Sequence, residues 1–240
     1  MPNPTAAMLV IGDEILSGRT RDANMHFLAG QLTEAGIDLK EVRVVSDDRD
    51  AIIAAVRALS DAHDTVITSG GIGPTHDDIT ADCIAAAFGD TIDVRDDART
   101  LLQAHYDRSG QVLNDARLRM ARIPASATLI DNPVSTAPGF TIRNVHVMAG
   151  VPSVFQAMVA SVLPTLQGGA PLLSRTLRVD RGEGDIAGPL STFAAQYADL
   201  AVGSYPFQKD GRYGSNIVLR GQDETRLDAA LATLTDLFAT

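Results

Sequence analysis

Three pairs of acidic residues and one glycine-rich loop carry most of the chemistry that this sequence offers. The acidic pairs are Asp13-Glu14, Asp47-Asp48 and Asp77-Asp78, and the glycines are Gly70, Gly71 and Gly73. Carboxylate oxygens are preferred ligands of Mg²⁺, and glycines let backbone amides approach a phosphate closely. Carboxylates beside a phosphate repel it unless a cation lies between them, so we expect Mg²⁺ or another divalent cation as the cofactor.

The glycine loop spans residues 68–80, between a run typical of a strand and a run typical of a helix. The start of a helix adds its positive dipole end to any anion site that the loop forms. Neither the dinucleotide-binding fingerprint nor the P-loop applies, because the spacing differs and no Lys follows the glycines. A simpler interpretation is a tight turn in which Asp77 or Asp78 caps the helix. The expected phosphate-binding residues here are Gly70, Gly71, Gly73, Thr75 and His76.

Two further loops present small or hydroxyl-bearing residues. Residues 132–140 begin with Asn132 and contain Ser135 and Thr136, whose hydroxyls can donate to phosphate or ribose oxygens. The alternative for this loop is a rigid turn held by its prolines. Residues 149–153 form another strand-to-helix turn, in which the amide of Gly150 is placed to meet an anion.

The periodicity of the first two-thirds of the chain predicts alternating strands and helices. The expected strands are residues 6–11, 37–45 and 65–68, and the expected helices are 23–35, 50–62 and 79–88. Such βαβ units predict a largely parallel sheet with helices on both faces. The carboxyl ends of parallel strands share one edge of the sheet, so all three acidic pairs and the glycine loop are expected to converge there.

The rest of the chain predicts a less regular region and then a second domain. Helices are expected at 95–107, 115–122 and 152–166, a strand at 127–131, and a hairpin from 140–142 and 145–148. Residues 167–171 are the expected linker, so the predicted domains are 1–167 and 172–240. The second domain predicts the order β-α-β-β-α: strand 176–179, helix 185–197, strands 200–207 and 216–220 around a loop at 208–215, and helix 224–238.

Composition excludes several classes of partner. Of 240 residues, 20 are Lys or Arg and 30 are Asp or Glu, which gives a net charge of −10. This balance argues against a protein that binds nucleic acid or an anionic membrane. The single cysteine, Cys83, excludes an internal disulfide framework, and no apolar run reaches the roughly 20 residues of a membrane helix. We expect a cytoplasmic protein that acts on a small molecule.

Several of these stretches together resemble one family. The stretches are Gly12–Leu16, Asp22–Asn24, Asp47-Asp48, Ser69–Thr80, Asn132–Phe140 and Gly150–Pro152. In this order they look like the MoaB/Mog-type molybdopterin-binding domain of molybdenum cofactor biosynthesis, and most like the N-terminal region of CinA (competence/damage-inducible protein A). The resemblance implies a three-layer α/β sandwich with a mostly parallel sheet, followed by a small α+β domain. It also implies a homo-oligomer, either a dimer or a trimer.

The departures from the family pattern bear on the substrate. Ile72 stands where Mog-type adenylyltransferases have a Thr, and residues 74–78 look more like CinA and the related domain of eukaryotic FAD synthases. Ala149 and Val154 stand where CinA-type chains usually have a proline and a Glu. The resemblance to CinA suggests ADP-ribose as substrate, and the resemblance to FAD synthases suggests FAD.

Three functions remain open at this point. The first is metal-dependent hydrolysis of a nucleoside diphosphate derivative, with Asp47 and Asp78 as the catalytic pair. The expected metal ligands are Asp13, Glu14, Asp47, Asp77 and Asp78. The second is molybdopterin binding or adenylyl transfer, which would use the same loop and cation. The third is a protein that binds such a ligand without turnover.

Overall fold

The computed structural model describes residues 2–209 and 211–239 of the chain. Two compact units make up the chain, Met1–Gly169 and Ala170–Thr240. The division lies inside the linker expected at residues 167–171. Each unit has a hydrophobic core of its own. Within the described residues, no helix is long and apolar enough to cross a membrane.

The first unit is built on a six-stranded sheet in the order β2-β1-β3-β8-β7-β6. Its strands are β1 (Thr5–Ile11), β2 (Asp38–Val45), β3 (Thr65–Ser69), β6 (Thr128–Ile130), β7 (Gly139–Ile142) and β8 (Val145–Met148). The neighbours β2, β1, β3 and β8 are parallel, whereas β7 pairs antiparallel with β8 and with β6. The predicted α/β class with a mostly parallel sheet is therefore confirmed.

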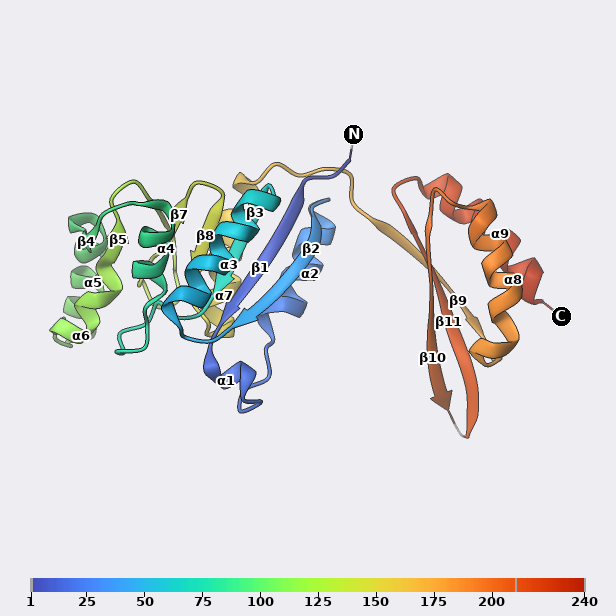
Figure 1. Cartoon of the computed structure of the whole chain (residues 1–240), viewed down its shortest axis with the longest axis horizontal. Coiled ribbons are helices and arrows are strands. Elements are labelled where there is room, and N and C mark those ends of the chain that lie inside the picture. The colour runs from blue at the N-terminus through green and yellow to red at the C-terminus, as the bar shows by residue number, and fades with distance from the viewer. Residues whose placement is uncertain (1, 210, 240) are drawn as a thin grey trace. The chain divides into compact units, whose positions relative to one another are not determined.

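Side chains of β1 show why helices cover both faces of this sheet. Ala7, Leu9 and Ile11 lie in one buried cluster, and the alternate residues Ala6, Met8 and Val10 lie in another. Alternate residues of a strand point to opposite faces, so a strand buried on both sides must be apolar throughout. In Figure 1, α3 and α4 lie on one face of the sheet, and α2 and α7 lie on the other.

Several helix ends in the first unit fall at residues that the sequence marks. They are α1 (Asp13–Leu16), α2 (Asn24–Glu34), α3 (Arg49–Ala62), α4 (Thr80–Phe88), α5 (Asp96–Ser109), α6 (Asp115–Leu118) and α7 (Pro152–Val162), with 3₁₀ turns at Arg119–Ala121 and Leu163–Thr165. The Asp48 carboxylate accepts from the Ala51 amide at 2.9 Å and caps α3. Gly89 and Gly110 end α4 and α5 in the left-handed conformation.

Three short elements differ from the sequence-based expectation. α1 covers one turn directly after β1, and β4 (Ile92–Val94) pairs antiparallel with β5 (Arg122–Pro124). The helix expected at 115–122 ends early, in a 3₁₀ turn and then β5. Strands of three residues are too short to show a period, so only their pairing partner defines them.

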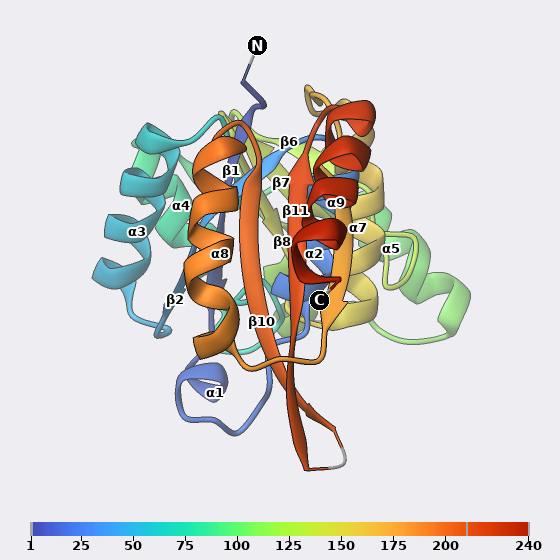
Figure 2. The ribbon, with the colours of Figure 1, turned by 90° about the vertical axis from the view of Figure 1, so that its right-hand side faces the viewer.

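The second unit has the expected order, β9 (Leu173–Val179), α8 (Glu183–Gln196), β10 (Ala201–Lys209), β11 (Arg212–Gly221) and α9 (Glu224–Phe238). Its sheet runs β10-β11-β9 and is antiparallel throughout. Buried residues of α8 and α9 pack with Ile217 and Leu219 of β11. Figure 2 shows the two helices side by side in front of β10 and β11. The predicted small α+β domain is therefore confirmed.

The prediction of a long loop at residues 208–215 is wrong. β10 continues to Lys209 and β11 begins at Arg212, so the two strands pair almost to the end of the hairpin. Asp210 itself lies outside the described residues. Charged and glycine residues resembled a loop because their side chains need no core, but main-chain pairing does not depend on side-chain burial.

Candidate functional site

A cleft of about 560 Å³ opens at the carboxyl edge of the parallel strands in the first unit. Residues that directly follow β1, β2, β3 and β8 line it, because parallel strands end at the same edge. Predicted site residues in its lining are Glu14, Asp47, Gly70, Gly71, Gly73, Asp77, Asp78, Asn132, Ser135 and Gly150. The predicted residues outside its lining are Asp13, Thr75, His76 and Thr136.

Gly70 and Gly71 hold the glycine loop in a shape that other residues do not fit. Gly70 has φ +110°, and a Cβ on it would lie 2.2 Å from the Ile11 carbonyl oxygen. Gly71 has φ +69°, and its Cβ would lie 2.1 Å from Thr80 Oγ1. The Thr80 hydroxyl donates to the Gly70 carbonyl at 3.1 Å, and the Thr80 amide donates to the Gly71 carbonyl at 3.0 Å. The start of α4 thus fixes the loop from behind.

The loop leaves three consecutive amides available to a ligand. Within the described residues, the amides of Gly71, Ile72 and Gly73 donate to no protein acceptor, although all three residues line the cleft. Gly150 faces this loop closely, because a Cβ on it would lie 3.3 Å from the Gly70 Cα. Unpaired amides along one wall form a concave site of the kind that binds anions.

Asp77 and Asp78 interact with Thr75 and do not cap α4. Thr75 Oγ1 lies 2.5 Å from Asp77 Oδ1 and 2.6 Å from Asp78 Oδ2, and the Thr75 amide donates to Asp78 Oδ2 at 2.8 Å. α4 begins after Ile79 with no side-chain cap, so the interpretation of either aspartate as a helix cap is wrong. The Thr75 hydroxyl lowers the pKa of Asp77. The His76 side chain is 98% exposed, 3.8 Å from Asp77.

The acidic residues after β1 and β2 meet on the opposite side of the cleft. The Asp13 amide donates to Asp47 Oδ2 at 3.0 Å, which joins the two strand ends. Burial raises the pKa of Asp47, and the negative charges of Asp13, Glu14 and Asp77 raise it further.

The protein alone gathers too few ligands for a closed metal site. Within the part of the chain that the structure describes, no three His, Cys, Asp or Glu side chains come together closely enough to hold a metal ion. Glu14, Asp47 and Asp77 nevertheless line the cleft, and the charges of Glu14 and Asp77 raise the pKa of Asp47. Mg²⁺ is commonly held by one or two carboxylates together with substrate phosphates, and these residues fit that arrangement.

The Asn132 side chain forms its hydrogen bonds within its own loop. Its side-chain oxygen accepts from the amides of Val134 and Ser135, and its Nδ2 donates to Ser135 Oγ at 2.6 Å and to the Ala137 carbonyl at 2.8 Å. Thr136 has φ +65° and lies 3.1 Å from His105 Nδ1, away from the cleft. Of the two hydroxyl-bearing residues of this loop, Ser135 belongs to the cleft lining and Thr136 does not.

Asn24 joins three elements beneath the cleft, although sequence reasoning gave it no role. Its Nδ2 donates to Ser69 Oγ and to the Gly150 carbonyl, both at 2.8 Å, so it links the start of α2 to the ends of β3 and β8. Asp22 holds it in place by accepting from its amide at 3.3 Å. The signal available in the sequence was the Asp22–Asn24 motif.

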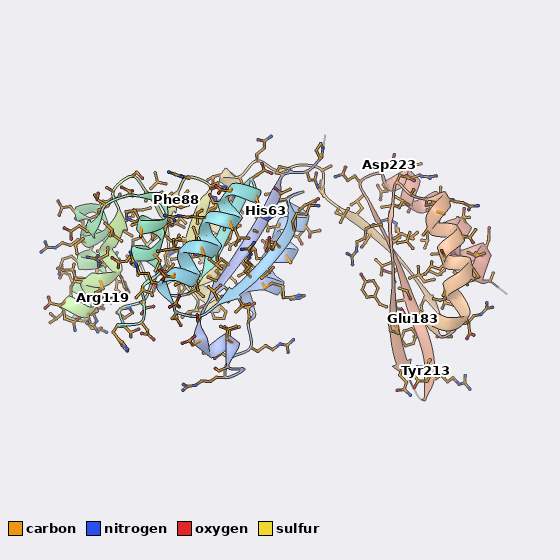
Figure 3. The ribbon with its side chains drawn as sticks, viewed as in Figure 1. His63, Phe88, Arg119, Glu183, Tyr213 and Asp223 are labelled. Atoms are coloured by element: carbon orange, nitrogen blue, oxygen red, sulfur yellow. The ribbon has the colours of Figure 1, made fainter. Side chains whose placement is uncertain are left out.

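Arg119 is a cation behind the glycine loop that sequence reasoning missed. Its Nη2 lies 3.4 Å from the Asp78 carbonyl oxygen, its Nε is buried without a partner, and no ion pair within the described residues involves it. The nearby Arg122 is paired with Asp82 at 2.5 Å. Arg119 shares a small cavity with Gly71 and Gly73, and Figure 3 labels it. No sequence signal distinguished it from neighbouring arginines.

Comparison with known proteins agrees with this geometry. Residues 7–168 match the family model described as "Probable molybdopterin binding domain". The chain belongs to this molybdopterin-binding domain family. The match covers every residue of the cleft and all of the sheet except the first two residues of β1, and the resemblance drawn from the motifs is therefore confirmed. Residues 171–240 match the model "FAD synthase, middle domain", which corresponds to the second unit.

Members similar to this one carry two kinds of name. A "Probable FAD synthase" from Caenorhabditis elegans is 34% identical over 98% of this chain and 50% of its own length. A "CinA-like protein" from Geobacter is 37% identical over 69% of this chain and 41% of its own. A solved structure of CinA from Thermoplasma acidophilum, a protein described as having unknown function, is 35% identical with a TM-score of 0.63 and covers 69% of this chain and 99% of that one. This chain thus spans about half the length of the FAD synthase relative.

Proposed function

We propose that the first unit binds a nucleoside diphosphate derivative together with Mg²⁺ and hydrolyses its pyrophosphate bond. The observation that carries this proposal is that unpaired amides and several carboxylates line the same cleft. The amides belong to Gly71, Ile72 and Gly73, and the carboxylates belong to Glu14, Asp47, Asp77 and Asp78. A diphosphate in the cleft would accept hydrogen bonds from the amides, and a cation bound to the diphosphate would be coordinated by the carboxylates.

Arg119 adds positive charge on the amide side of the site. Its guanidinium has no ion pair within the described residues and lies beside the Gly71–Gly73 segment. Arg119 lies outside the lining of the cleft, so its positive charge would attract a phosphate held by these amides from behind the loop. We assign Arg119 to electrostatic support of phosphate binding in this site.

The chemistry requires a water molecule, a base and charge neutralisation. Water attacks one phosphorus, the P–O bond to the bridging oxygen breaks, and two phosphate monoesters form with the release of two protons when both are fully ionised. We assign Asp47, whose pKa is raised by burial and by neighbouring carboxylates, to accept a proton from the attacking water. Asp78 shapes the loop through Thr75 while its side chain lines the cleft. Mg²⁺, when bound, would neutralise phosphate charge.

The names of the relatives indicate the class of substrate. FAD and ADP-ribose both contain an adenosine diphosphate moiety, so both fit a site built for a diphosphate. The "Probable FAD synthase" relative aligns over nearly the whole of this chain, which favours a flavin dinucleotide. The cleft of about 560 Å³ is within the usual range of small-molecule sites.

A second candidate function is molybdopterin binding or adenylyl transfer. The description of the family model favours it, and the matched residues 7–168 contain the whole cleft. This function would use the same amides and cation but would join a nucleotide to a pterin phosphate. It predicts pterin affinity, which the hydrolase does not require.

The deciding experiment measures product formation from FAD, ADP-ribose, NAD and ATP, with Mg²⁺ or with EDTA. We expect AMP from FAD or ADP-ribose, lost in EDTA and reduced at least about 100-fold in Asp47→Asn. Asp61→Asn is the matched control, because Asp61 is an exposed carboxylate of α3 outside the cleft lining. Arg119→Gln is expected to raise KM about tenfold or more while Arg117→Gln leaves it unchanged.

Other results of this experiment would support a different function. Binding of FAD or ADP-ribose without product would leave a non-catalytic binding protein. Affinity for molybdopterin with no product from the four nucleotides would favour the second candidate. Full activity of Asp47→Asn would remove Asp47 from the mechanism.

A further inference from the structure

Helices of the second unit cover only one face of its three-stranded sheet. Figure 1 shows α8 and α9 on the same side of this sheet, where Ile217 and Leu219 of β11 pack with them. Alternate residues of a strand point to opposite faces and directly paired residues share a face, so the strand register defines the other, open face. Its cations and aromatic residues are Arg178, Tyr205, Phe207, Lys209, Arg212 and Arg220. None of the described strand residues on the open face is acidic.

The open face gathers positive charge in an acidic protein. Of its four cations, only Arg178 has an ion pair within the described residues, with Asp180 just beyond β9. Lys209 and Arg212 lie directly opposite each other, and like charges in this position destabilise a strand pair. Composition argues against nucleic acid through the net charge of −10, but a net charge averages over the whole surface and does not register cations concentrated on one face.

These cations extend along the length of the sheet. Arg220 and Arg212 lie at opposite ends of β11, about 27 Å apart at the usual rise of a strand. A second cavity, of about 440 Å³, lies at the hairpin end, and the residues of the open face that line it are Arg178, Phe207, Lys209 and Arg212. A single nucleotide carries its phosphate at one point, whereas an extended polyanion can contact cations along the whole face.

Tyr205 provides an exposed ring between these cations. A Cβ on Gly203 would lie 3.1 Å from the Tyr205 ring, so the ring lies over this glycine of its own strand. Arg220 Nη2 donates to Tyr205 Oη at 2.8 Å, and Tyr205 is 46% exposed. Phe207 is the less exposed ring, because the Arg178 guanidinium lies over it, 4.5 Å from the ring centre. Tyr205 is therefore the ring of this face that a planar ligand can stack on.

Asn216 lies in the same row of the sheet as Tyr205. It is directly opposite Tyr205 on one side and Arg178 on the other. Its side-chain amide is half-buried and forms no hydrogen bond within the described residues. An asparagine amide presents both donors and an acceptor, which match the edges of nucleobases. A stacking ring, a free amide and cations thus share one face.

We propose that this open face binds a single-stranded nucleic acid. One base would stack on Tyr205, the Asn216 amide would bond to a base edge, and phosphates would contact the four cations. Stacking and backbone contacts of this kind give affinity with little dependence on sequence. A duplex keeps its bases stacked inside and would leave Tyr205 unused. An acidic polypeptide would contact the cations but would supply no base for the ring.

The first test measures binding of a labelled oligouridine of about 12 nucleotides to the full chain by fluorescence anisotropy. Tyr205→Leu is expected to weaken binding about tenfold or more, because base stacking is lost, while Tyr205→Phe retains it. Tyr213→Leu is the matched control and is expected to change nothing. Tyr213 is a tyrosine of the same hairpin with 68% exposure, but it directly follows Arg212 and therefore lies on the helix-covered side of the sheet.

The second test measures the salt dependence of the same binding. For single strands, the logarithm of the binding constant falls with the logarithm of salt concentration by about 0.7 per neutralised phosphate. Arg220→Gln and Arg212→Gln are therefore each expected to reduce this slope by about 0.7. Arg226→Gln, which changes a cation of α9 paired with Asp199, is expected to leave the slope unchanged.

Several results would overturn the inference, whether or not the first unit is a hydrolase. Absence of oligouridine binding at low salt would remove the nucleic acid altogether. Equal affinities of Tyr205→Leu and Tyr213→Leu would show that no base stacks on the open face. A duplex of the same length bound as tightly as the single strand would show that only charge is recognised. Polyglutamate bound more tightly than oligouridine would identify an acidic polypeptide as the partner.

Discussion

At the scale of single residues, the site separates side chains that shape loops from side chains left free for a ligand. Asn132 and Thr75 form their hydrogen bonds within their own loops. The Arg119 guanidinium has no ion-pair partner among the described residues, and its Nε is buried without a hydrogen-bond partner. The pKa of Asp47 is raised by neighbouring carboxylates. Residue type alone did not show this difference, because it depends on which acceptors the fold brings near each group.

His146 provides a residue-scale prediction about pH. It is buried in β8, with Nδ1 2.8 Å from Thr141 Oγ1, and burial lowers its pKa from 6.5 to about 4. The folded protein therefore keeps the ring neutral, whereas the unfolded chain takes up a proton near pH 6.5. The stability contribution is complete above pH 6.5 and is lost as the pH falls toward 4.

Urea unfolding at pH 8 and pH 5 measures this effect. Wild type is expected to lose about 2 kcal/mol more than His146→Gln between these pH values, from the two pKa values and linkage. Gln keeps a hydrogen-bonding group for Thr141 but cannot titrate. The same pH dependence in both proteins would mean that His146 titrates normally in the folded state.

At the scale of elements, the end of β3 and the start of α4 together set the position of the glycine loop. Thr68–Thr80 was recognisable as a loop from its glycines, and the strand and helix on either side were predicted within a residue or two. The sequence did not show that Gly70 must approach the carbonyl of Ile11, because this contact joins two different strands.

Gly70→Ala tests this arrangement. Its positive φ and the 2.2 Å approach to Ile11 predict a loss of about 3 kcal/mol or more. Gly89→Ala is the matched control, since Gly89 has φ +68° but nothing within 4 Å of a Cβ, and about 1 kcal/mol is expected. The shift of the urea midpoint at constant m measures both. Equal effects would show that backbone conformation alone, and not the contact with β1, limits Gly70.

At the scale of the whole molecule, two units with separate cores divide the proposed functions. All residues of the cleft belong to Met1–Gly169, and all residues of the second cavity belong to Ala170–Thr240. The dimer or trimer implied by the family resemblance stays a prediction.

A fragment of residues 1–171 tests this independence. Gly169 belongs in it, because its amide donates to the Ala35 and Gly36 carbonyls. The fragment is expected to unfold in one cooperative transition and to keep any metal-dependent activity of the full chain, since it contains both clusters of the first core. Circular dichroism during thermal unfolding measures the transition. A fragment without a cooperative transition would show that the second unit is needed to fold the first.

The sequence by itself determined the order of strands and helices, the division into two units and the convergence of Asp47 with the glycine loop. These features depend on local periodicity and on the rule that parallel strands end at one edge. Tertiary structure decided the arrangement of groups that no local pattern brings together: it placed Arg119 behind the loop and set Lys209 opposite Arg212. The first contact joins segments distant in sequence, and the second depends on strand register.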